Sequence, residues 1–130
     1  MLRGLLIAFV CVASFVATNV SALGASRFSG AASFYGEESA GPVASGGTYR
    51  PEKLTCAHRT LPFGTRLRVT DRKTHRSVSV TVNDRGPFVN GRVLDLSLAA
   101  ARSLRMTDRG VIDVSAVVQS LGRKPAVVAH

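Results

Sequence analysis

The sequence predicts a small, mainly β protein: a closed barrel of about six short strands with one inserted helix. Two observations lead to this prediction. Short segments in which apolar and polar residues alternate are separated by turns rich in Gly, Pro and Asp, whereas a single segment shows helical spacing of its apolar residues. In addition, only one cysteine lies outside the N-terminal segment, so no internal disulfide is expected and a well-closed core must stabilise the fold.

Residues 1–22 are typical of a secretory signal peptide. Arg3 lies in a short positive start, an apolar run covers residues 5–16, and small residues precede a cleavage point after Ala22. The run is shorter than the ~20 residues that a spanning helix needs, so no stable membrane insertion is expected after cleavage. Cys11 lies inside the apolar run without a small residue before it, which argues against a lipid anchor.

The remaining chain suffices for one small domain. We expect residues 23–29 to form a flexible leader, residues 30–120 to form the barrel domain, and residues 121–130 to form a loose tail.

Strands are predicted where apolar residues alternate or cluster between turn residues. The clearest case is residues 65–70, in which Leu67 and Val69 are expected to face the core and their arginine neighbours to face water. A polar hairpin at residues 71–75 connects this strand to one that ends at Asn83. The other strands are expected at residues 30–36, 54–58, 92–95 and 111–118.

One helix is predicted between the last two strands, from Ser97 to Met106. Ser97 is a typical N-cap residue. Leu98, Ala101 and Leu104 fall on one helical face, which we expect to pack on the barrel.

The chain is strongly basic, with 17 Lys and Arg against 8 Asp and Glu and a formal charge of +9, of which Arg3 leaves with the signal peptide. Such an excess favours an anionic partner. Nucleic acid is not expected for an exported protein, and a cell-envelope polymer or an anionic membrane surface fits better. The alternative is that the charge only keeps the domain soluble.

Neither a cofactor nor a metal ion is predicted, because Cys, His and carboxylates do not occur with metal-site spacing. Cys56 is expected to be a small buried apolar residue rather than a catalytic thiol.

The segment with the most chemical content is N-D-R-G-P-F at residues 83–88. It follows an alternating strand directly, so the strand end fixes Asp84 while the turn exposes it. A carboxylate in so basic a chain has either a catalytic role or a structural one, such as accepting backbone N–H bonds in its own turn.

Three further blocks complete a pattern: A-S-G-G-T-Y at residues 44–49, A-H-R-T-L-P-F-G-T at residues 57–65, and G-R-V-L-D-L-S at residues 91–97. Together with residues 83–88, in this order and spacing, they closely resemble the rare lipoprotein A (RlpA) family, over roughly residues 32–119. The resemblance implies a six-stranded double-psi β-barrel with one short helix, related in shape to expansins. It also implies an exported protein of the periplasm or cell envelope of a Gram-negative bacterium.

The resemblance further implies lytic transglycosylase activity. Such an enzyme cleaves the β-1,4 bond between N-acetylmuramic acid and N-acetylglucosamine in peptidoglycan and leaves a 1,6-anhydro end. Its implied partner is the peptidoglycan glycan strand, bound by a monomer. Asp84 and His58 match the expected catalytic positions, with Asp84 as the acid and base. The candidate substrate-binding residues are Arg85, Tyr35, Tyr49 and Thr60.

Each of these residues also has a structural interpretation. His58 is expected to hydrogen-bond Asp84 or a sugar, or to be a half-buried strand residue. Arg85 is expected to grip substrate, or to pair with Asp84 or Asp95. Tyr35 and Tyr49 are expected to stack on sugar faces, or to be ordinary rim and core aromatics.

The chain departs from the family at two positions, with Gly47 where the family has Glu and Arg50 where it has Asp. Glu37, Glu38 or Glu52 is a candidate replacement. Two hypotheses therefore stand beside the enzyme: a catalytically impaired peptidoglycan-binding barrel, and an expansin-like protein that loosens glycan contacts without cleavage.

Overall fold

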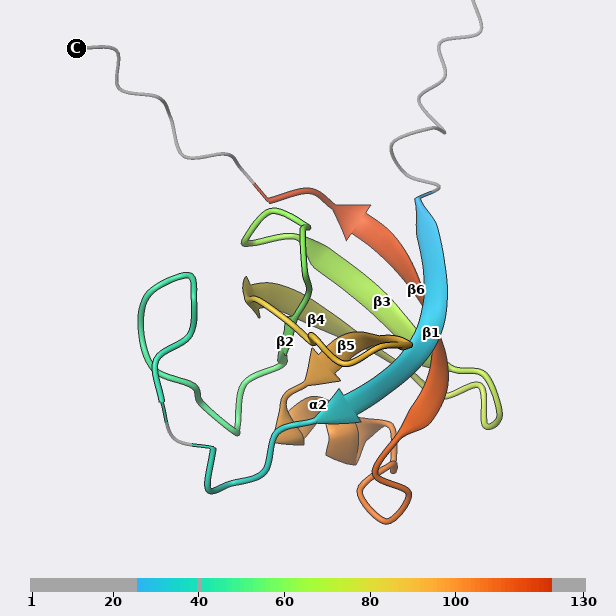
Figure 1. Ribbon diagram of the computed structural model, residues 1–130. Helices are drawn as coiled ribbons and strands as arrows, with labels where there is room; N and C mark the ends of the chain where they lie inside the picture. The colour runs from blue at the N-terminus through green and yellow to red at the C-terminus, as the bar shows by residue number, and fades with distance from the viewer. Residues whose placement is uncertain (1–25, 40, 123–130) are drawn as a thin grey trace, which may run out of the picture.

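The computed structural model describes residues 26–39 and 41–122, and the predicted signal peptide and most of the predicted tail lie outside these residues. Within them, six strands close into a barrel in the order β1-β5-β2-β4-β3-β6, with one short helix, α2 (Figure 1). The prediction of a mainly β barrel with one helix is confirmed. The elements are β1 (Arg27–Phe34), β2 (Thr55–Ala57), β3 (Arg66–Asp71), β4 (Ser77–Asp84), β5 (Arg92–Leu96), α2 (Leu98–Ser103) and β6 (Ile112–Ser120).

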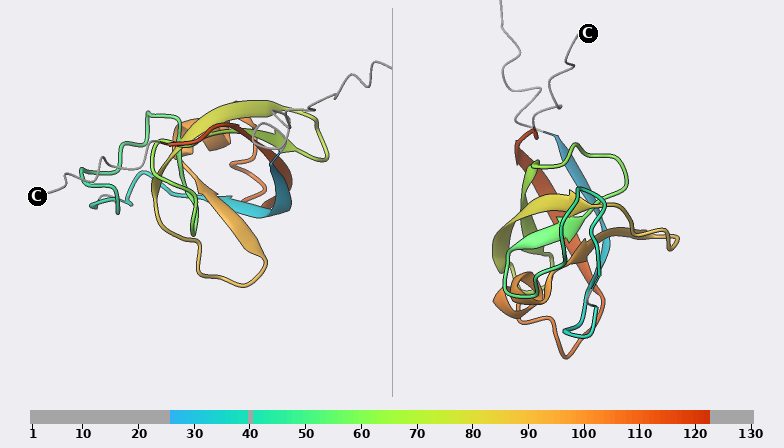
Figure 2. Two further views of the ribbon diagram at one scale, coloured as in Figure 1. Left: turned by 90° about the horizontal axis from the view of Figure 1, so that it is seen from above. Right: turned by 90° about the vertical axis from the view of Figure 1, so that its left-hand side faces the viewer.

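The barrel mixes parallel and antiparallel pairing. β1 pairs with β5, and β2 with β4, in parallel, whereas the other four neighbouring pairs are antiparallel. Parallel partners need a crossover connection between them, and two such crossovers in one six-stranded barrel are consistent with the double-psi topology. Figure 2 shows the ring of strands from above and the long connection after β1 on its outside.

The core fills the inside of this ring. Leu67 and Val69 are fully buried while Arg66 and Arg68 are exposed, which confirms the predicted alternation of β3. β4 and β5 contribute in the same way, because every second side chain of a strand points inward. The largest buried side chains are Leu67, Leu94, Leu96, Leu104, Met106, Val69, Val80, Val82 and Val114.

The helix α2 covers one end of the barrel (Figure 1). The Ser97 hydroxyl accepts a hydrogen bond from the Ala100 N–H at 3.3 Å, as expected for an N-cap. Leu98, Ala101 and Leu104 are buried, so the predicted packing face is confirmed. The helix is shorter than predicted, because the chain leaves helical geometry at Arg105, whose φ is +53°.

The first strand begins earlier than predicted. Residues 27–29 were expected in a flexible leader, but they belong to β1, where Arg27 pairs with Val117 and Phe28 with Ala116. The prediction was wrong at these residues because their strand partner lies far away in the sequence, and β6 is itself longer than expected, reaching Ser120.

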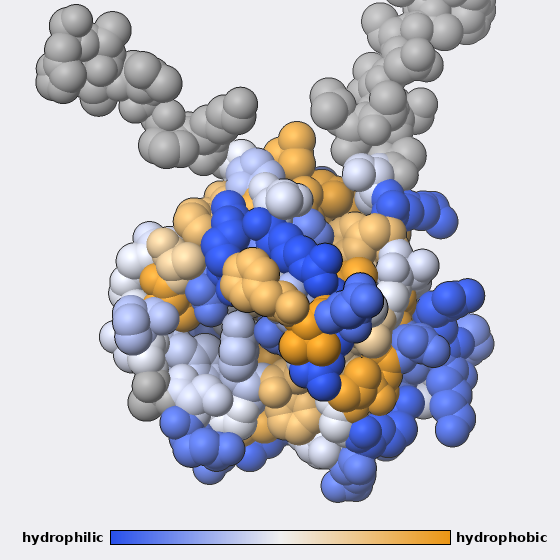
Figure 3. All heavy atoms as spheres, viewed as in Figure 1, coloured by the Kyte–Doolittle hydropathy of each residue, from blue (hydrophilic) through white to orange (hydrophobic). Residues whose placement is uncertain are grey.

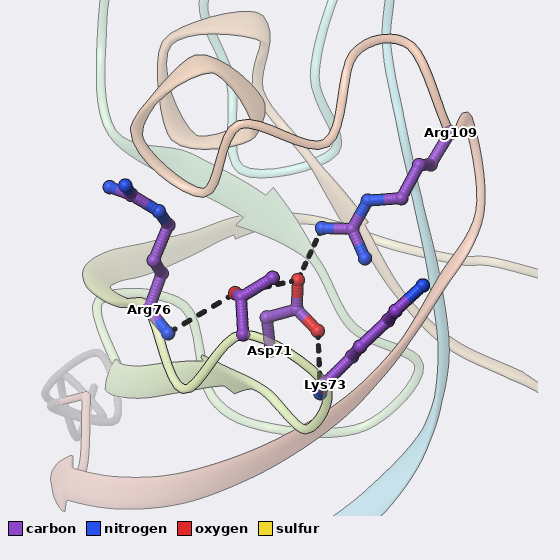
Figure 4. Close-up of polar contacts among 5 residues, drawn as sticks. Asp71, Lys73, Arg76 and Arg109 are labelled. Atoms are coloured by element: carbon purple, nitrogen blue, oxygen red, sulfur yellow. Dashed lines mark hydrogen bonds and ion pairs between the residues drawn. The ribbon is translucent and has the colours of Figure 1, made fainter.

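A buried carboxylate holds together the barrel end that carries the β3–β4 hairpin. Asp71 is only 1% exposed, forms an ion pair with Arg109, and accepts hydrogen bonds from the Lys73 N–H at 2.9 Å and the Thr74 hydroxyl at 3.0 Å (Figure 4). Burial opposes ionisation, but Arg109 and the two donors outweigh it and lower the pKa of Asp71 to about 2. Asp71 thus ties the hairpin to the connection between α2 and β6.

Candidate functional site

Asp84 lies at the last position of β4, one residue beyond the predicted strand end, and it is half-buried rather than exposed by its turn. Its Oδ1 accepts hydrogen bonds from the backbone N–H of Ala44 at 2.8 Å and of Arg85 at 2.9 Å. Its Oδ2 accepts one longer hydrogen bond, from the Tyr35 hydroxyl at 3.3 Å. Because Oδ1 already has two donors, Oδ2 is the oxygen with room to carry a proton.

The Asp84 side chain lines a cavity of about 200 Å³ together with Tyr35, Ser39, Gly41, Pro42, Val43 and Tyr49. We call this the Asp84 cavity. Its outer wall is a loop closed by a bridge between Pro42 and Thr48 and attached to the barrel by the hydrogen bond from the Ser45 N–H to the Asn83 carbonyl, at 3.1 Å.

The two tyrosines of the cavity support each other. Their rings meet edge to face with centroids 5.4 Å apart. The Tyr49 hydroxyl donates to the Tyr35 carbonyl at 3.4 Å and accepts from the Leu98 N–H at 3.0 Å. Tyr49 is therefore a buried support, and Tyr35 is the tyrosine whose hydroxyl reaches the carboxylate.

A second carboxylate, Asp95 of β5, belongs to the same region. It accepts a hydrogen bond from the Ser33 hydroxyl. Burial, and then the charges of Asp95 and Asp84, raise the pKa of the Tyr35 hydroxyl. Sequence reasoning missed Asp95 as a site residue. The available signal was an acidic residue between two core leucines of a strand, in a chain with few acids.

His58 follows β2, and its contact with Asp84 is made by the main chain: the His58 N–H donates to the Asp84 carbonyl at 3.1 Å. The ring faces elsewhere. Its Nδ1 accepts hydrogen bonds from the N–H of Thr60 at 3.1 Å and of Leu61 at 3.0 Å. Burial, followed by the charges of Arg85 and Arg59, lowers the pKa of the imidazole.

Arg85 supports the main chain around the site. Its guanidinium donates to the carbonyls of His58 at 3.2 Å and Leu61 at 2.8 Å, and it lies 3.9 Å from the centre of the Phe63 ring. In the part of the chain that the structure describes, it makes no ion pair with Asp84 or Asp95.

Thr60 lies with His58 at a second cavity of about 270 Å³, whose other lining residues are Phe28, Arg59, Arg92 and Val93. We call this the His58 cavity. The structure thus brings Tyr35, Tyr49 and Asp84 together at one cavity and places His58 and Thr60 at another.

The two positions that depart from the family are exposed. Gly47 has a φ of +103° and Arg50 carries no ion pair among the described residues. Of the candidate replacements, Glu37 forms an ion pair at 3.2 Å with Arg102 of α2. None of Glu37, Glu38 and Glu52 lines the Asp84 cavity. Asp95 lies across β2 from Asp84, because Ala57 pairs with both residues.

Across residues 26–39 and 41–122, no three His, Cys, Asp or Glu side chains lie close enough to hold a metal ion. Over the same residues, no helix has the length and apolar character required to cross a bilayer.

Comparison with known proteins identifies the family. The sequence profile described as lytic transglycolase matches residues 27–116, which is most of the chain. The chain belongs to this family. Among its lytic transglycolase relatives, the Nostoc sp. protein named "Probable endolytic peptidoglycan transglycosylase RlpA" is 54% identical over 99 residues, or 74% of this chain and 26% of that protein. The resemblance to the RlpA family is therefore confirmed, and the chain spans about a quarter of the length of this relative.

Solved structures agree with the family's fold. The Streptomyces papain inhibitor matches with a TM-score of 0.60 and 23% identity, over 73% of this chain and 96% of that chain, and at this identity the likeness concerns the fold alone. An expansin of Clavibacter michiganensis matches with a TM-score of 0.56 and 27% identity, over 78% of this chain and 52% of that chain. The predicted likeness in shape to expansins is confirmed.

Proposed function

We propose that this lytic transglycolase-family barrel cleaves the β-1,4 bond between N-acetylmuramic acid and N-acetylglucosamine of peptidoglycan and leaves a 1,6-anhydro end. The observation that carries the proposal is Asp84: a half-buried carboxylate on a strand end that lines a cavity beside Tyr35 and whose Oδ2 accepts only one long hydrogen bond. The names of the relatives support the same activity.

The reaction needs one group that first donates and then accepts a proton. Protonated Asp84 gives its proton to the bridging oxygen as the bond from that oxygen to C1 of N-acetylmuramic acid breaks. The 6-hydroxyl of the same sugar then forms the new bond to C1, and its proton passes to the Asp84 carboxylate. No water is consumed, and Asp84 returns to its starting state.

Asp95 takes a different role in this scheme. The transition state of glycoside cleavage is oxocarbenium-like and carries positive charge. Asp95, which accepts a hydrogen bond from the Ser33 hydroxyl and lies across Ala57 from Asp84, supplies negative charge near that centre. This arrangement does not require the Glu and Asp that Gly47 and Arg50 replace.

The sequence supports a setting for this activity. We propose an exported protein of the periplasm or cell envelope that acts as a monomer on glycan strands. The excess of positive charge suits peptidoglycan, whose peptides carry carboxylates.

The test is digestion of purified sacculi, with the released fragments analysed by mass spectrometry. We expect anhydro-ended muropeptides from the wild type and none from Asp84→Asn, while Asp113→Asn, a substitution of an exposed carboxylate on β6, behaves as the wild type. Sedimentation with sacculi without anhydro products would contradict the enzyme and leave the binding barrel.

A further inference from the structure

The His58 cavity adjoins the proposed active site without being part of the Asp84 cavity. Arg92, which lines it, donates to the Ser33 hydroxyl at 3.5 Å, and that hydroxyl in turn donates to Asp95. On its other side, the His58 N–H holds the Asp84 carbonyl. Hydrogen bonds thus connect residues of the His58 cavity to both Asp95 and Asp84.

The hydrogen bonds of His58 fix where its proton lies. Nδ1 accepts from two backbone N–H groups, those of Thr60 and Leu61, so a proton on Nδ1 would face two donors. The imidazole is therefore neutral with its proton on Nε2. The lowered pKa of His58 agrees with this state.

The Nε2–H group is available to a ligand. Among the described residues, none accepts a hydrogen bond from Nε2, and no fully buried side-chain nitrogen or oxygen lacks a partner. Nε2–H is thus open to solvent. The Phe28 ring packs on the imidazole with centroids 5.1 Å apart and fixes its orientation.

The rim of this region carries an unusually exposed aromatic residue, Phe88, with 81% of its surface accessible. The loop that presents it is held firmly, because the Arg59 guanidinium donates to the carbonyls of Pro87, Val89 and Arg92 at 2.6, 3.0 and 3.0 Å. The Phe88 ring and the Asp95 carboxylate both come within 4 Å of the position that a Cβ on Gly86 would take. Phe88 therefore lies beside Gly86, as Asp95 does, on a loop held by Arg59, which itself lines the His58 cavity.

We propose that the His58 cavity, with Phe88 at its rim, is a second sugar subsite that takes an N-acetylated hexopyranose of the glycan strand. In it, His58 donates its Nε2–H to an acyl or hydroxyl oxygen of that sugar and positions it, rather than exchanging protons with Asp84. This inference rests on the proposed function. It adds the place where the glycan strand binds beyond Asp84 and Asp95.

The chemistry of the lining fits this occupant. Phe28 and Val93 offer apolar walls for the acetyl methyl group and the ring face, while His58, Thr60 and Arg92 offer donors for its oxygens. The volume of about 270 Å³ is just below the ~300–1,000 Å³ of sites for larger small molecules, which suits one sugar ring. Figure 3 shows apolar side chains among strongly hydrophilic ones on the face where β1 and β5 lie in Figure 1.

The test measures binding of chitotetraose, a soluble β-1,4-linked oligomer of N-acetylglucosamine, by calorimetry. Phe88→Ala is expected to weaken binding about tenfold through loss of an aromatic face, and Phe88→Trp to preserve it. His58→Asn is expected to weaken binding about fivefold, because Asn retains an acceptor for the Thr60 and Leu61 N–H groups but has no donor at Nε2. Val111→Ala, an exposed apolar residue away from both cavities, is the control.

A spectroscopic measurement separates positioning from mere packing. Nitrogen-detected NMR of the imidazole should report the Nε2–H form of His58 and a change of the Nε2 signal when chitotetraose is added. The inference is overturned if Phe88→Ala and His58→Asn both bind as the wild type, or if the proton lies on Nδ1. Phe88 is exposed, so its variants test the subsite even where His58→Asn does not fold.

The outcome also separates this inference from the proposed function. If sacculi release no anhydro products but chitotetraose binding depends on Phe88 and His58, the activity fails and the subsite stands. If anhydro products form normally and the Phe88→Ala enzyme has an unchanged KM on sacculi, the subsite fails and the activity stands.

Discussion

The substitution Asp71→Asn tests the claim that one buried carboxylate holds the hairpin end of the barrel to the connection before β6. Asn retains an acceptor for the Lys73 N–H, but its amide cannot pair with the Arg109 guanidinium. The variant therefore loses mainly the Arg109 interaction and leaves the backbone of the turn supported.

Two routes give similar magnitudes for the loss. A hydrogen bond to a charged group contributes about 1.5–3 kcal/mol to stability. The cost of losing the Asp71–Arg109 pair stays below that of breaking a fully buried ion pair, because the Arg109 side chain is 31% exposed and can be rehydrated. Independently, the fall in the pKa of Asp71 from 3.8 to about 2 on folding corresponds to about 2 kcal/mol in the free energy of unfolding at neutral pH. We expect Asp71→Asn to lower the free energy of unfolding by about 2–3 kcal/mol at pH 7.

The effect has a defined pH dependence. The pKa of Asp71 is lower in the folded state than in the unfolded state, so its contribution is complete above pH 3.8 and is lost as the pH falls towards about 2. The assay is urea unfolding followed by far-UV circular dichroism, since the chain has no Trp. Asp113→Asn is the control and should change stability by less than about 0.5 kcal/mol. A loss of stability for Asp71→Asn at pH 7 as small as that for Asp113→Asn would contradict this role of Asp71, as would a loss near pH 2 as large as that at pH 7.

Three further predictions follow from the fold. Burial, with the charge of Asp95, raises the pKa of the Cys56 thiol to about 12. Cys56 should therefore resist thiol reagents at pH 8 in the folded protein and react after unfolding in urea. Rapid labelling of the folded protein would contradict this. Arg59→Lys removes the planar group that holds three carbonyls after β4, so hydrogen exchange at residues 88–92 should accelerate by tenfold or so while that of β3 stays unchanged. Leu104→Ala opens a cavity under α2 and should cost about 2–5 kcal/mol in urea unfolding, whereas Leu121→Ala, at an exposed position, should cost little.

Local patterns predicted the parts of the fold that depend on neighbours in sequence. The alternation around Leu67 and Val69 and the Ser97 cap each express a short-range rule, and both are confirmed. The start of β1 was not predictable in this way. Residues 27–29 lack a strong strand pattern, and they become a strand because β6, more than eighty positions later, supplies hydrogen-bond partners.

The candidate site shows the same division. The place of Asp84 at a strand end was predictable from the alternating strand before it and the Gly-Pro turn after it, although its half-burial was not. Asp95 was not, because its place beside Ser33 results from the parallel pairing of β5 with β1. The orientation of the His58 ring also depended on the structure, since the sequence does not say whether Nδ1 faces a carboxylate or the next two backbone N–H groups.

Digestion of sacculi with the wild-type protein in water enriched in oxygen-18 distinguishes attack on C1 by a sugar hydroxyl from attack by water. We expect released muropeptides that end in 1,6-anhydro-N-acetylmuramic acid, are lighter by one water than hydrolytic products, and carry no oxygen-18. Reducing ends that carry oxygen-18 would contradict this expectation, because Asp84 would then be activating water. Release of no fragments at all would contradict it as well and favour the binding barrel.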